Sequence, residues 1–462
     1  MLNRSIFREY DIRGVVGQDL TAAFVEALGA AFAGYLADAG HPGGRIVMGR
    51  DGRLSSPELS RSLAAGMVSA GARVIDVGMG PTPALYFAAH EFQADAGIMI
   101  TGSHNPPDYN GFKMVMGGRS FFGAQIQALY QRMAAGREAE RSGGTLETRP
   151  VLESYLARIT RDFRPGRPLK VVLDCGNGAA GAVAPDLLQR LPGISGEVLF
   201  PEVDGHFPNH HPDPTIPENL VDLRRRMLET GAELGIAFDG DGDRIGALDE
   251  AGRIVWGDRL MILFARQLLA ERPGAMVLGD VKCSQLLFDA VAQAGGQPLM
   301  WKTGHSLIKD KMKETGAPLA GEMSGHLFFA DRYLGFDDAL YAAVRLMELV
   351  AGASTPLSAR LSGLPEVHAT PELRIDCADD RKFQVMERVR TRLRESGADL
   401  SEVDGVRVRL PDGWWLLRVS NTQPALVARV EAQSAARRDA VAAELAALLA
   451  GEGVVFPSWS AA

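Results

Sequence analysis

The sequence predicts an α/β protein with three consecutive α/β domains, whose sheets are mixed and mostly parallel, and a smaller C-terminal α+β domain around one cleft. The length of 462 residues allows several domains of ~150 residues each. Short apolar segments alternate with helical segments up to about residue 365, which is typical of helix-covered parallel sheets. Beyond that point several strands follow one another, so the last domain differs.

Composition and charge narrow the class of protein before any motif is considered. Hydrophobic residues make up 46% of the chain and charged residues 23%, which is ordinary for a soluble globular protein. The formal net charge of −8 gives nucleic-acid binding no electrostatic basis. The three cysteines lack metal or disulfide spacing, and we find neither a signal peptide nor a membrane span. We therefore expect a cytoplasmic protein without nucleic-acid or membrane partners.

The first predicted domain covers residues 1–150, in which the segment FREYDIRG at 7–14 precedes a helix. Residues 21–39 carry apolar side chains at helical spacing, and a polar stretch at 137–148 indicates the end of the domain. Its expected strands are residues 46–48, 72–77, 97–100 and, as one arm of a hairpin, 112–115.

Two further α/β domains follow, which we assign to residues 151–255 and 256–365. In both, short apolar strands alternate with helical segments. The expected elements are strands 170–174 and 234–238 with the hairpin 245–248 and 253–255, then helix 257–270 and strands 276–278, 298–301 and 319–320.

The last predicted domain, residues 366–462, has a different order of elements. A strand and a helix precede three successive strands, and an alanine- and leucine-rich helix runs to Leu449. This order suggests a small α+β domain. Its expected elements are strand 372–376, helix 380–396 and strands 406–410, 414–419 and 425–431.

The segment AGIMITGSHNP, residues 96–106, is the most informative stretch of the chain. An apolar strand ends at Ile100 and is followed at once by polar residues and two prolines. Loops at the carboxyl ends of strands are where α/β folds bind ligands. Gly102 leaves the backbone beside Ser103 open to close approach. Ser103 is therefore a candidate nucleophile, although a serine in such a loop is more often a turn residue.

A second polar loop, DGDGDR, directly follows the expected strand 234–238. Its three carboxylates, Asp239, Asp241 and Asp243, repel one another unless a cation lies among them, and the glycines let the loop curl around a small ion. Oxygen ligands favour Mg²⁺ or Ca²⁺. An EF-hand is excluded because Arg244 stands where its invariant glycine is required. A solvated acidic turn is the alternative.

Charged and polar side chains also follow the strands of the last two domains. Guanidinium groups match phosphate oxygens, and hydroxyl and amide donors can complete a phosphate site. We therefore interpret RVSNTQP as a candidate phosphate loop, although such a string is also a common turn. The candidates are Lys282, His305, Glu322, Ser324 and His326 in the third domain and Arg418, Ser420, Asn421 and Thr422 in the fourth.

Taken together, TGSHNP with YNGFK, DGDGDR, GEMSGH and RVSNTQP resemble the motifs of the α-D-phosphohexomutase family, most closely its bacterial phosphomannomutase/phosphoglucomutase group. The likeness covers almost the entire chain, in order, with one motif set in each domain. It implies reversible phosphoryl transfer between C1 and C6 of mannose and glucose phosphates. It further implies an enzyme phosphoserine and a hexose 1,6-bisphosphate intermediate.

The resemblance also implies a role for each motif residue. Ser103 carries the phosphoryl group, and its phosphate joins the three aspartates in binding Mg²⁺. Lys113 or His326 removes the proton from the attacking sugar hydroxyl, and Arg13 and Arg244 supply positive charge nearby. The implied substrate ligands are Tyr10, Lys282, His305, Glu322, Ser324, Arg418, Ser420, Asn421 and Thr422.

Three alternatives stand beside this hypothesis. The glycine turn GNGAAG at 176–181 lies between a strand and a helix, as in a dinucleotide-dependent oxidoreductase. A non-catalytic sugar-phosphate sensor would need the same binding loops. A phosphoglucosamine mutase would differ only in its sugar. Small sugar phosphates are the expected partners; the preference between mannose and glucose is left open, and so is the oligomeric state, with which a monomer is compatible.

Overall fold

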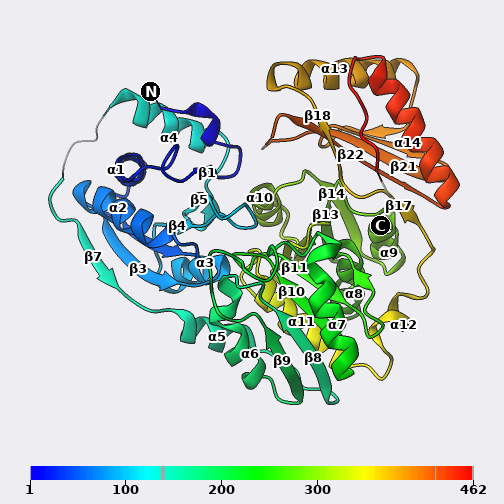
Figure 1. Ribbon diagram of the computed structural model, residues 1–462, viewed down its shortest axis with the longest axis horizontal. Helices are drawn as coiled ribbons and strands as arrows, with labels where there is room; N and C mark the ends of the chain where they lie inside the picture. Colours follow the sequence, from blue (N-terminus) through cyan, green and yellow to red (C-terminus); the bar gives the residue numbers. More distant parts are fainter. Residues whose placement is uncertain (1, 137–140, 422, 460–462) are drawn as a thin grey trace.

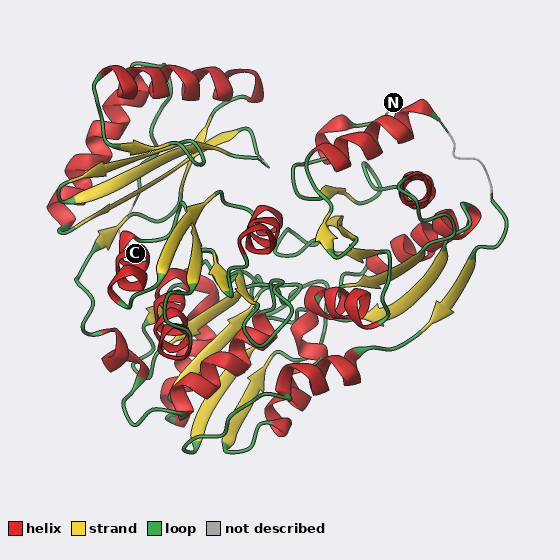
Figure 2. Cartoon of the chain, turned by 180° about the vertical axis from the view of Figure 1, so that it is seen from behind, coloured by secondary structure: helices red, strands yellow, loops and turns green. Residues whose placement is uncertain are grey.

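The computed structural model describes residues 2–136, 141–421 and 423–459, and it consists of four lobes in chain order (Figure 1). The strands form four separate sheets, one in each lobe. The views from both sides place the N-terminal and C-terminal lobes next to each other above the two middle lobes (Figures 1 and 2). Among the described residues, no helix combines the length and the apolar character needed to cross a membrane.

The first sheet mixes parallel and antiparallel pairing. Its elements are β1 Ile12–Val15, β2 Arg45–Arg50, β3 Arg73–Met79, β4 Ala96–Ile100, β5 Tyr109–Met116, β6 Arg119–Ser120 and β7 Thr145–Thr148, with helices α1 Ala22–Asp38, α2 Ser56–Ser69, α3 Thr82–Glu91 and α4 Ala124–Ala135. The order is β1-β5-β4-β2-β3-β7, with β6 paired to β5. Strands β4, β2, β3 and β7 run parallel, and β5 is antiparallel to its neighbours. Helices α1, α2 and α4 pack on one face and α3 on the other.

The second sheet is parallel except at one edge. Its elements are β8 Leu169–Asp174, β9 Ile194–Leu199, β10 Leu234–Phe238, β11 Ile245–Leu248 and β12 Ile254–Val255, with helices α5 Leu152–Thr160, α6 Ala184–Arg190 and α7 Val221–Thr230. The order is β12-β11-β10-β8-β9, and β11 pairs antiparallel with both β10 and β12. Short 3₁₀ helices are η1 Arg4–Ile6, η2 Ala179–Ala182 and η3 Pro217–Leu220.

The third sheet has the order β14-β13-β15-β16, in which only the pairing of β15 with β16 is antiparallel among the described strands. Its strands are β13 Met276–Asp280, β14 Gln297–Trp301, β15 Leu319–Gly321 and β16 Leu327–Phe329. Its helices are α8 Gly257–Glu271, α9 Gln285–Gln293, α10 His305–Thr315, α11 Ala339–Ala351 and α12 Leu357–Leu361.

The fourth lobe is built on an antiparallel sheet in the order β17-β22-β21-β20-β19, with β18 also paired to β22. Its elements are β17 His368–Ala369, β18 Leu373–Asp376, β19 Leu400–Ser401, β20 Val406–Leu410, β21 Gly413–Val419 and β22 Ala425–Ala432, with helices α13 Asp379–Glu395 and α14 Ala435–Ala450. Three α/β lobes with mixed sheets and one smaller α+β lobe confirm the predicted fold class.

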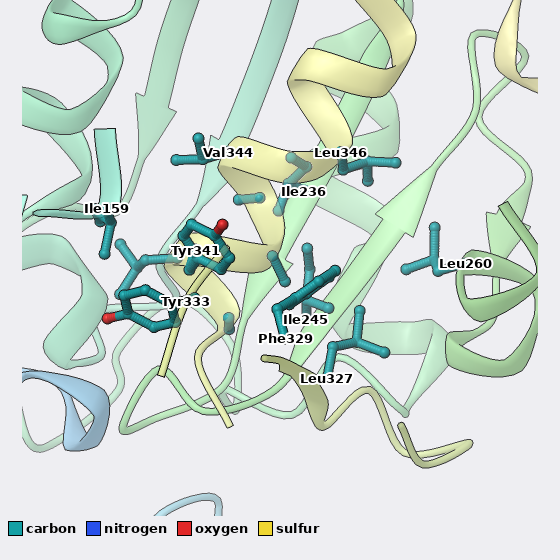
Figure 3. Packing of buried hydrophobic residues seen from close by; sticks show 14 of the residues in the cluster. Ile159, Ile236, Ile245, Leu260, Leu327, Phe329, Tyr333, Tyr341, Val344 and Leu346 are labelled. Atoms are coloured by element: carbon teal, nitrogen blue, oxygen red, sulfur yellow. The ribbon is translucent and has the colours of Figure 1, made fainter. Parts of the chain in front are cut away.

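Helix α11 was not among the elements expected from the sequence, and it carries the core of the middle lobes. All of its residues are buried, and its side chains contact β8, β10, β11 and β16. Figure 3 shows Tyr341, Val344 and Leu346 among Ile236 and Ile245 of the second sheet. The same apolar cluster includes α3 of the first lobe. The first three lobes therefore share one continuous core.

We expect Leu346→Ala to lower the free energy of unfolding by about 2–5 kcal/mol, because it leaves a cavity in this shared core. Leu346 is 0% exposed. Chemical denaturation followed by tryptophan fluorescence measures the change. Leu228→Ala on α7 is the matched control, since Leu228 is 59% exposed and its loss should change stability by less than about 0.5 kcal/mol. Equal effects of the two substitutions would contradict the central place of α11.

Candidate active site

Ser103 lies in the loop between β4 and β5, residues 101–108, which we call the serine loop. Its side chain is buried, with Oγ 3.0 Å from Asp239 Oδ2 and 3.0 Å from His104 Nδ1. Its N–H donates to Thr101 Oγ1 at 2.8 Å. Its φ of +49° is in the left-handed region, which non-glycine residues adopt rarely. The candidate nucleophile is therefore held in a strained turn against the carboxylates of the second lobe.

The loop after β10, residues 239–244, which we call the acidic loop, brings three carboxylates together. Asp239, Asp241 and Asp243 are all 0% exposed, and one oxygen of each lies within 4.8 Å of the others. The N–H groups of Asp243 and Arg244 donate to Asp239 Oδ1 at 3.0 and 3.1 Å. Thr82 Oγ1 of the first lobe donates to Asp241 Oδ2 at 2.5 Å. The group can hold a metal ion.

Burial and neighbouring charges move the pKa values of these groups in opposite directions. Burial, with the charges of Asp243 and Asp241, raises the pKa of Asp239 well above its ordinary value. Burial also opposes the charge of Asp241, but the Lys113 ammonium outweighs it and lowers the pKa of Asp241. Lys113 Nζ donates to Asp241 Oδ2 at 2.7 Å and also to Asp243 Oδ2. Burial likewise disfavours the Lys113 charge, yet both carboxylates outweigh it and raise its pKa.

Two arginines bind the loops that surround Ser103. Arg13 donates to Asn105 Oδ1 at 2.7 Å from Nη1 and to Asp11 Oδ2 at 2.5 Å from Nη2. Arg244 Nε donates to His326 Nε2 at 2.9 Å. Arg13 therefore contacts the serine loop itself, and Arg244 connects the acidic loop to the third lobe.

One carboxylate of the third lobe, Asp337, organises both predicted histidines. The rings of His305 and His326 are stacked, with centroids 5.5 Å apart and an interplanar angle of 22°. Asp337 Oδ2 lies 3.3 Å from Nδ1 of His305 and 3.4 Å from Nδ1 of His326. Its Oδ1 accepts from Lys309 Nζ at 2.8 Å. Burial opposes the Asp337 charge, but Lys309 and His305 outweigh it and hold the pKa well below its ordinary value.

The phenol of Tyr10 is the point where the first, third and fourth lobes meet. Its hydroxyl donates to the carbonyl of Thr303 at 2.9 Å and accepts from Asn421 Nδ2 at 2.6 Å. The N–H of Thr303 donates to Asp404 Oδ2 at 3.1 Å, and the same oxygen accepts from Arg418 Nε at 2.8 Å. Burial raises the pKa of Tyr10, so the phenol stays protonated and can donate.

A lysine of helix α13 holds the loop between β21 and β22 by hydrogen bonds. Lys382 Nζ donates to the carbonyls of Ser420 at 2.9 Å and Gln423 at 3.0 Å. The N–H of Gln423 donates to Ser420 Oγ at 3.1 Å. The structure thus places Arg418 at the end of β21 and Ser420 directly after this strand, whereas Thr422 lies outside the described residues.

The predicted sugar ligands of the third lobe are also held in place. Glu322 Oε1 accepts from the N–H of Gly304 at 2.6 Å, and its Oε2 accepts from Ser324 Oγ at 3.1 Å. Lys282 Nζ donates to Glu372 Oε2 at 3.0 Å, in the segment that joins the third lobe to the fourth. Burial disfavours the Lys282 charge, but Glu372 outweighs it and raises the pKa.

Most of the sequence-predicted residues that the structure describes lie in two neighbouring groups. Ser103, Lys113, Arg244 and His326 surround the acidic loop, and His305 stacks on His326. Tyr10, Asn421 and Arg418 meet around Thr303 and Asp404, whereas Lys282 pairs with Glu372. Sequence reasoning missed the side chains that orient them. The sequence indicates Asp337 only as a carboxylate that shortly precedes helix α11. The missed residues are Asp51, Arg53, Thr82, Lys309, Asp337, Glu372, Lys382 and Asp404.

The glycine turn at 176–181 serves packing between loops of the second lobe. A Cβ at Gly181 would lie 2.1 Å from the carbonyl oxygen of Pro201, and one at Gly178 would lie 2.9 Å from that of Gly240. Both glycines are buried. Because protein backbone already approaches the turn this closely, the structure does not favour the dinucleotide alternative.

Buried carboxylates beside a serine hydroxyl, in a chain of three α/β lobes and one α+β lobe, define the kind of site, and comparison with known proteins identifies the family. Models of the phosphoglucomutase/phosphomannomutase domains match the chain in order. The alpha/beta/alpha domains I, II and III match residues 4–140, 153–252 and 256–368, and the C-terminal domain matches 372–448.

Whole proteins give the same result. The phosphomannomutase/phosphoglucomutase of Pseudomonas aeruginosa is 49% identical over 434 residues, which is 94% of this chain and 93% of that protein. The phosphoglucomutase of Neisseria gonorrhoeae is 46% identical over 440 residues and 94% of each chain. The crystal structure of a family protein from Burkholderia thailandensis matches with a TM-score of 0.91 at 46% identity, covering 99% of this chain and 100% of that one. The chain belongs to the phosphoglucomutase/phosphomannomutase family, and it is a mutase, an enzyme of the isomerase class.

We expect Glu372→Gln to lower the melting temperature most at neutral pH. The Lys282 ammonium lowers the pKa of Glu372 to about 2, against the opposing effect of burial. Because this value lies below that of the unfolded chain, about 4.5, the stabilisation is present above pH ~4.5 and is lost as the pH falls toward ~2. The expected loss is on the order of 1 kcal/mol.

Scanning calorimetry at several pH values measures this difference. It should stay constant from neutral pH down to about pH 5 and shrink below. Glu366→Gln is the control, since the Glu366 side chain is 85% exposed. A difference that grows in acid would contradict the ion pair's assigned role.

Proposed function

We propose that the protein interconverts hexose 1-phosphates and 6-phosphates, with mannose and glucose phosphates as substrates, by passing a phosphoryl group through Ser103. The observation that carries this proposal is the 3.0 Å contact between Ser103 Oγ and Asp239 Oδ2, which joins a buried hydroxyl to a buried acidic group. Phosphoryl transfer requires alignment and charge neutralisation more than covalent participation by other groups. The contacts around Ser103 support the proposal on both points, because Asp239 orients the hydroxyl and Lys113 places a positive charge beside the carboxylates.

We infer that Asp239, Asp241, Asp243 and the phosphate on Ser103 hold Mg²⁺. Three buried carboxylates fit a hard cation, and the Oδ1 atoms of Asp241 and Asp243 are buried without a hydrogen-bond partner among the described residues. When bound, the ion supplies charge neutralisation and polarises the bond to the leaving serine oxygen. A phosphoserine carries about −1.5 to −2 charges, so further cations are needed. Lys113 supplies one of these cations, because its ammonium group donates to the carboxylate of Asp241.

Of the two candidates for the general base, we favour His326. Lys113 is an ammonium ion while it donates to two carboxylates and has no lone pair to accept a proton. His326 Nε2 accepts a hydrogen bond from Arg244 Nε, so this nitrogen carries a lone pair, which becomes available to the sugar hydroxyl when Arg244 turns away from it. Asp337 Oδ2 lies 3.4 Å from the opposite nitrogen of the ring. We assign Lys113 and Arg13 to charge stabilisation.

We further propose that the β21–β22 loop binds the phosphate that is not being transferred. Arg418, Ser420, Asn421 and Thr422 supply guanidinium, hydroxyl and amide donors there. Glu322 and Ser324 then bind hydroxyls near the middle of the sugar ring, and Lys282, His305 and Tyr10 complete the contacts. A hexose 1,6-bisphosphate that turns around presents either phosphate to Ser103, so one site serves both directions.

Mannose and glucose phosphates are proposed as joint substrates because of the relatives' specificities. The 49% identical Pseudomonas aeruginosa relative is a phosphomannomutase/phosphoglucomutase. A probable phosphoglucosamine mutase of Methanopyrus kandleri is less similar, at 35% identity over 431 residues. Glu322 and Ser324, the proposed ligands of ring hydroxyls, would serve both epimers.

We expect Ser103→Ala to reduce turnover of both sugars by at least about 1,000-fold, because it removes the nucleophile. The measurement is a coupled assay of mannose 1-phosphate and glucose 1-phosphate, each with Mg²⁺ and a trace of hexose 1,6-bisphosphate. Ser154→Ala on α5 is the matched control and should keep full activity, since Ser154 Oγ bonds only a carbonyl of its own helix turn among the described contacts. Unchanged turnover in Ser103→Ala, or wild-type turnover of neither sugar, would refute the proposal.

We expect EDTA to abolish activity and Mg²⁺ to restore it. Asp243→Asn removes one anionic ligand and should raise the Mg²⁺ concentration for half-maximal activity by about 10-fold or more. Titration of Mg²⁺ in the same assay measures the shift. Asp289→Asn on the exposed face of α9 should titrate like the wild type. An Asp243→Asn protein with an unchanged Mg²⁺ requirement would contradict the proposed ligand set.

A further inference from the structure

A buried arginine, Arg53, donates hydrogen bonds to the backbone of the serine loop. Arg53 follows β2 and is 2% exposed. Its Nη2 donates to the carbonyls of Ser103 at 2.8 Å and Asn105 at 2.6 Å. Its Nη1 donates to the carbonyls of Pro106 at 2.6 Å and Tyr109 at 2.9 Å. One guanidinium therefore binds four backbone carbonyls that span the loop and the start of β5.

Asp51 holds both the arginine and the loop. Its Oδ2 accepts from the N–H of Gly102 at 3.1 Å and lies 3.3 Å from Arg53 Nε. Its Oδ1 accepts from Ser56 Oγ at 2.6 Å and from the N–H of Arg53 at 3.1 Å. Asp51 is 3% exposed, so the two charges form a buried pair that contacts the serine loop through the N–H of Gly102 on one side and four carbonyls on the other.

The surrounding residues are shaped to admit this guanidinium. A Cβ at Gly102 would lie 2.3 Å from Arg53 Nε, so a side chain there would collide with it. Arg53 Cζ also lies over the ring of Phe207 from the second lobe, 5.4 Å from its centroid. Ser103 occupies the left-handed region at φ +49°. Such a conformation costs on the order of 1–3 kcal/mol and persists only where neighbouring contacts enforce it.

We propose that Arg53 is a positioning residue, which fixes the backbone of the serine loop so that Ser103 Oγ faces Asp239. This inference rests on the proposed role of Ser103 as the phosphorylated residue. Arg53 acts through carbonyl groups and not through the reacting hydroxyl. A planar guanidinium has donors in a fixed fork, whereas an ammonium ion is a compact charge with three donors and cannot reach four carbonyls in this arrangement.

The test is Arg53→Lys in the full-length protein, because lysine keeps the charge and removes the fork. We expect kcat to fall about 100-fold, since a displacement of about 1 Å at a reacting centre has an effect of this size. The KM for glucose 1-phosphate should stay within about 3-fold, because the substrate phosphate is assigned to the β21–β22 loop.

The phosphorus NMR signal of the phosphorylated protein provides a second readout. In Arg53→Lys we expect this signal to shift or broaden, because the loop no longer holds the phosphoserine in one orientation. If Arg53 contributed only to stability, Arg53→Lys would melt at a lower temperature than the wild type and its phosphorus signal would be unchanged.

Arg345→Lys is the matched control for loss of a buried guanidinium. Arg345 is 4% exposed, lies on α11 and pairs with Asp331 at 2.9 Å, away from the serine loop. We expect this variant to melt at a lower temperature and to keep the kcat and the phosphorus signal of the wild type.

Wild-type kcat and phosphorus signal in Arg53→Lys would overturn the positioning role, whatever its melting temperature. If Arg53→Lys does not fold, Asp51→Asn gives the same readouts. It should lower kcat about 10-fold, and wild-type kcat in it would overturn the role. An active Ser103→Ala protein would overturn the proposed function as well. An inactive Ser103→Ala protein beside a fully active Arg53→Lys protein would overturn the positioning role alone.

Discussion

Three carboxylates buried around one serine hydroxyl create the electrostatic constraint on which the rest of the structure depends. Two unit charges about 4 Å apart interact by about 4 kcal/mol at an effective dielectric constant of 20, so the acidic loop requires cations close to it. Lys113 on β5 provides one from the first lobe, and Thr82 at the start of α3 provides a hydroxyl donor. The β4–β5 and β10–β11 connections must therefore face each other. The contact between Ser103 and Asp239 follows from this arrangement.

The apolar core shared by the first three lobes fixes the positions of these loops relative to one another. Helix α11 is buried on all sides and belongs in sequence to the third lobe, but its side chains pack against the second sheet. Asp337, which precedes this helix, lies 3.3 Å from the His305 ring and 3.4 Å from the His326 ring. The fourth lobe packs on the third through a small apolar cluster of Val281, Trp414 and Leu416. Polar contacts add to it, among them Lys282 with Glu372 and Ser284 with Glu431. Tyr10 connects the fourth lobe to the first through Asn421.

Much of this could be predicted from the sequence because the signals are local. The strands at 234–238 and 406–410 coincide with β10 and β20, and each motif loop follows a short apolar segment. Residues that orient the motifs carry no such signal. A buried arginine such as Arg53 looks in sequence like any surface arginine, and its partners lie some fifty positions away. Helix α11 is apolar on every side, so no one-sided pattern indicates which sheet it covers.

A radiolabelled phosphoryl group on Ser103 tests the central claim most directly. The labelled protein is mixed with an excess of unlabelled glucose 1-phosphate in a rapid-quench instrument, and label is counted on protein and on sugar. If Ser103 passes its phosphoryl group to the substrate across the acidic loop, label leaves the protein during the first turnover, at a rate no slower than kcat. Label that stays on the protein through many turnovers would contradict the account.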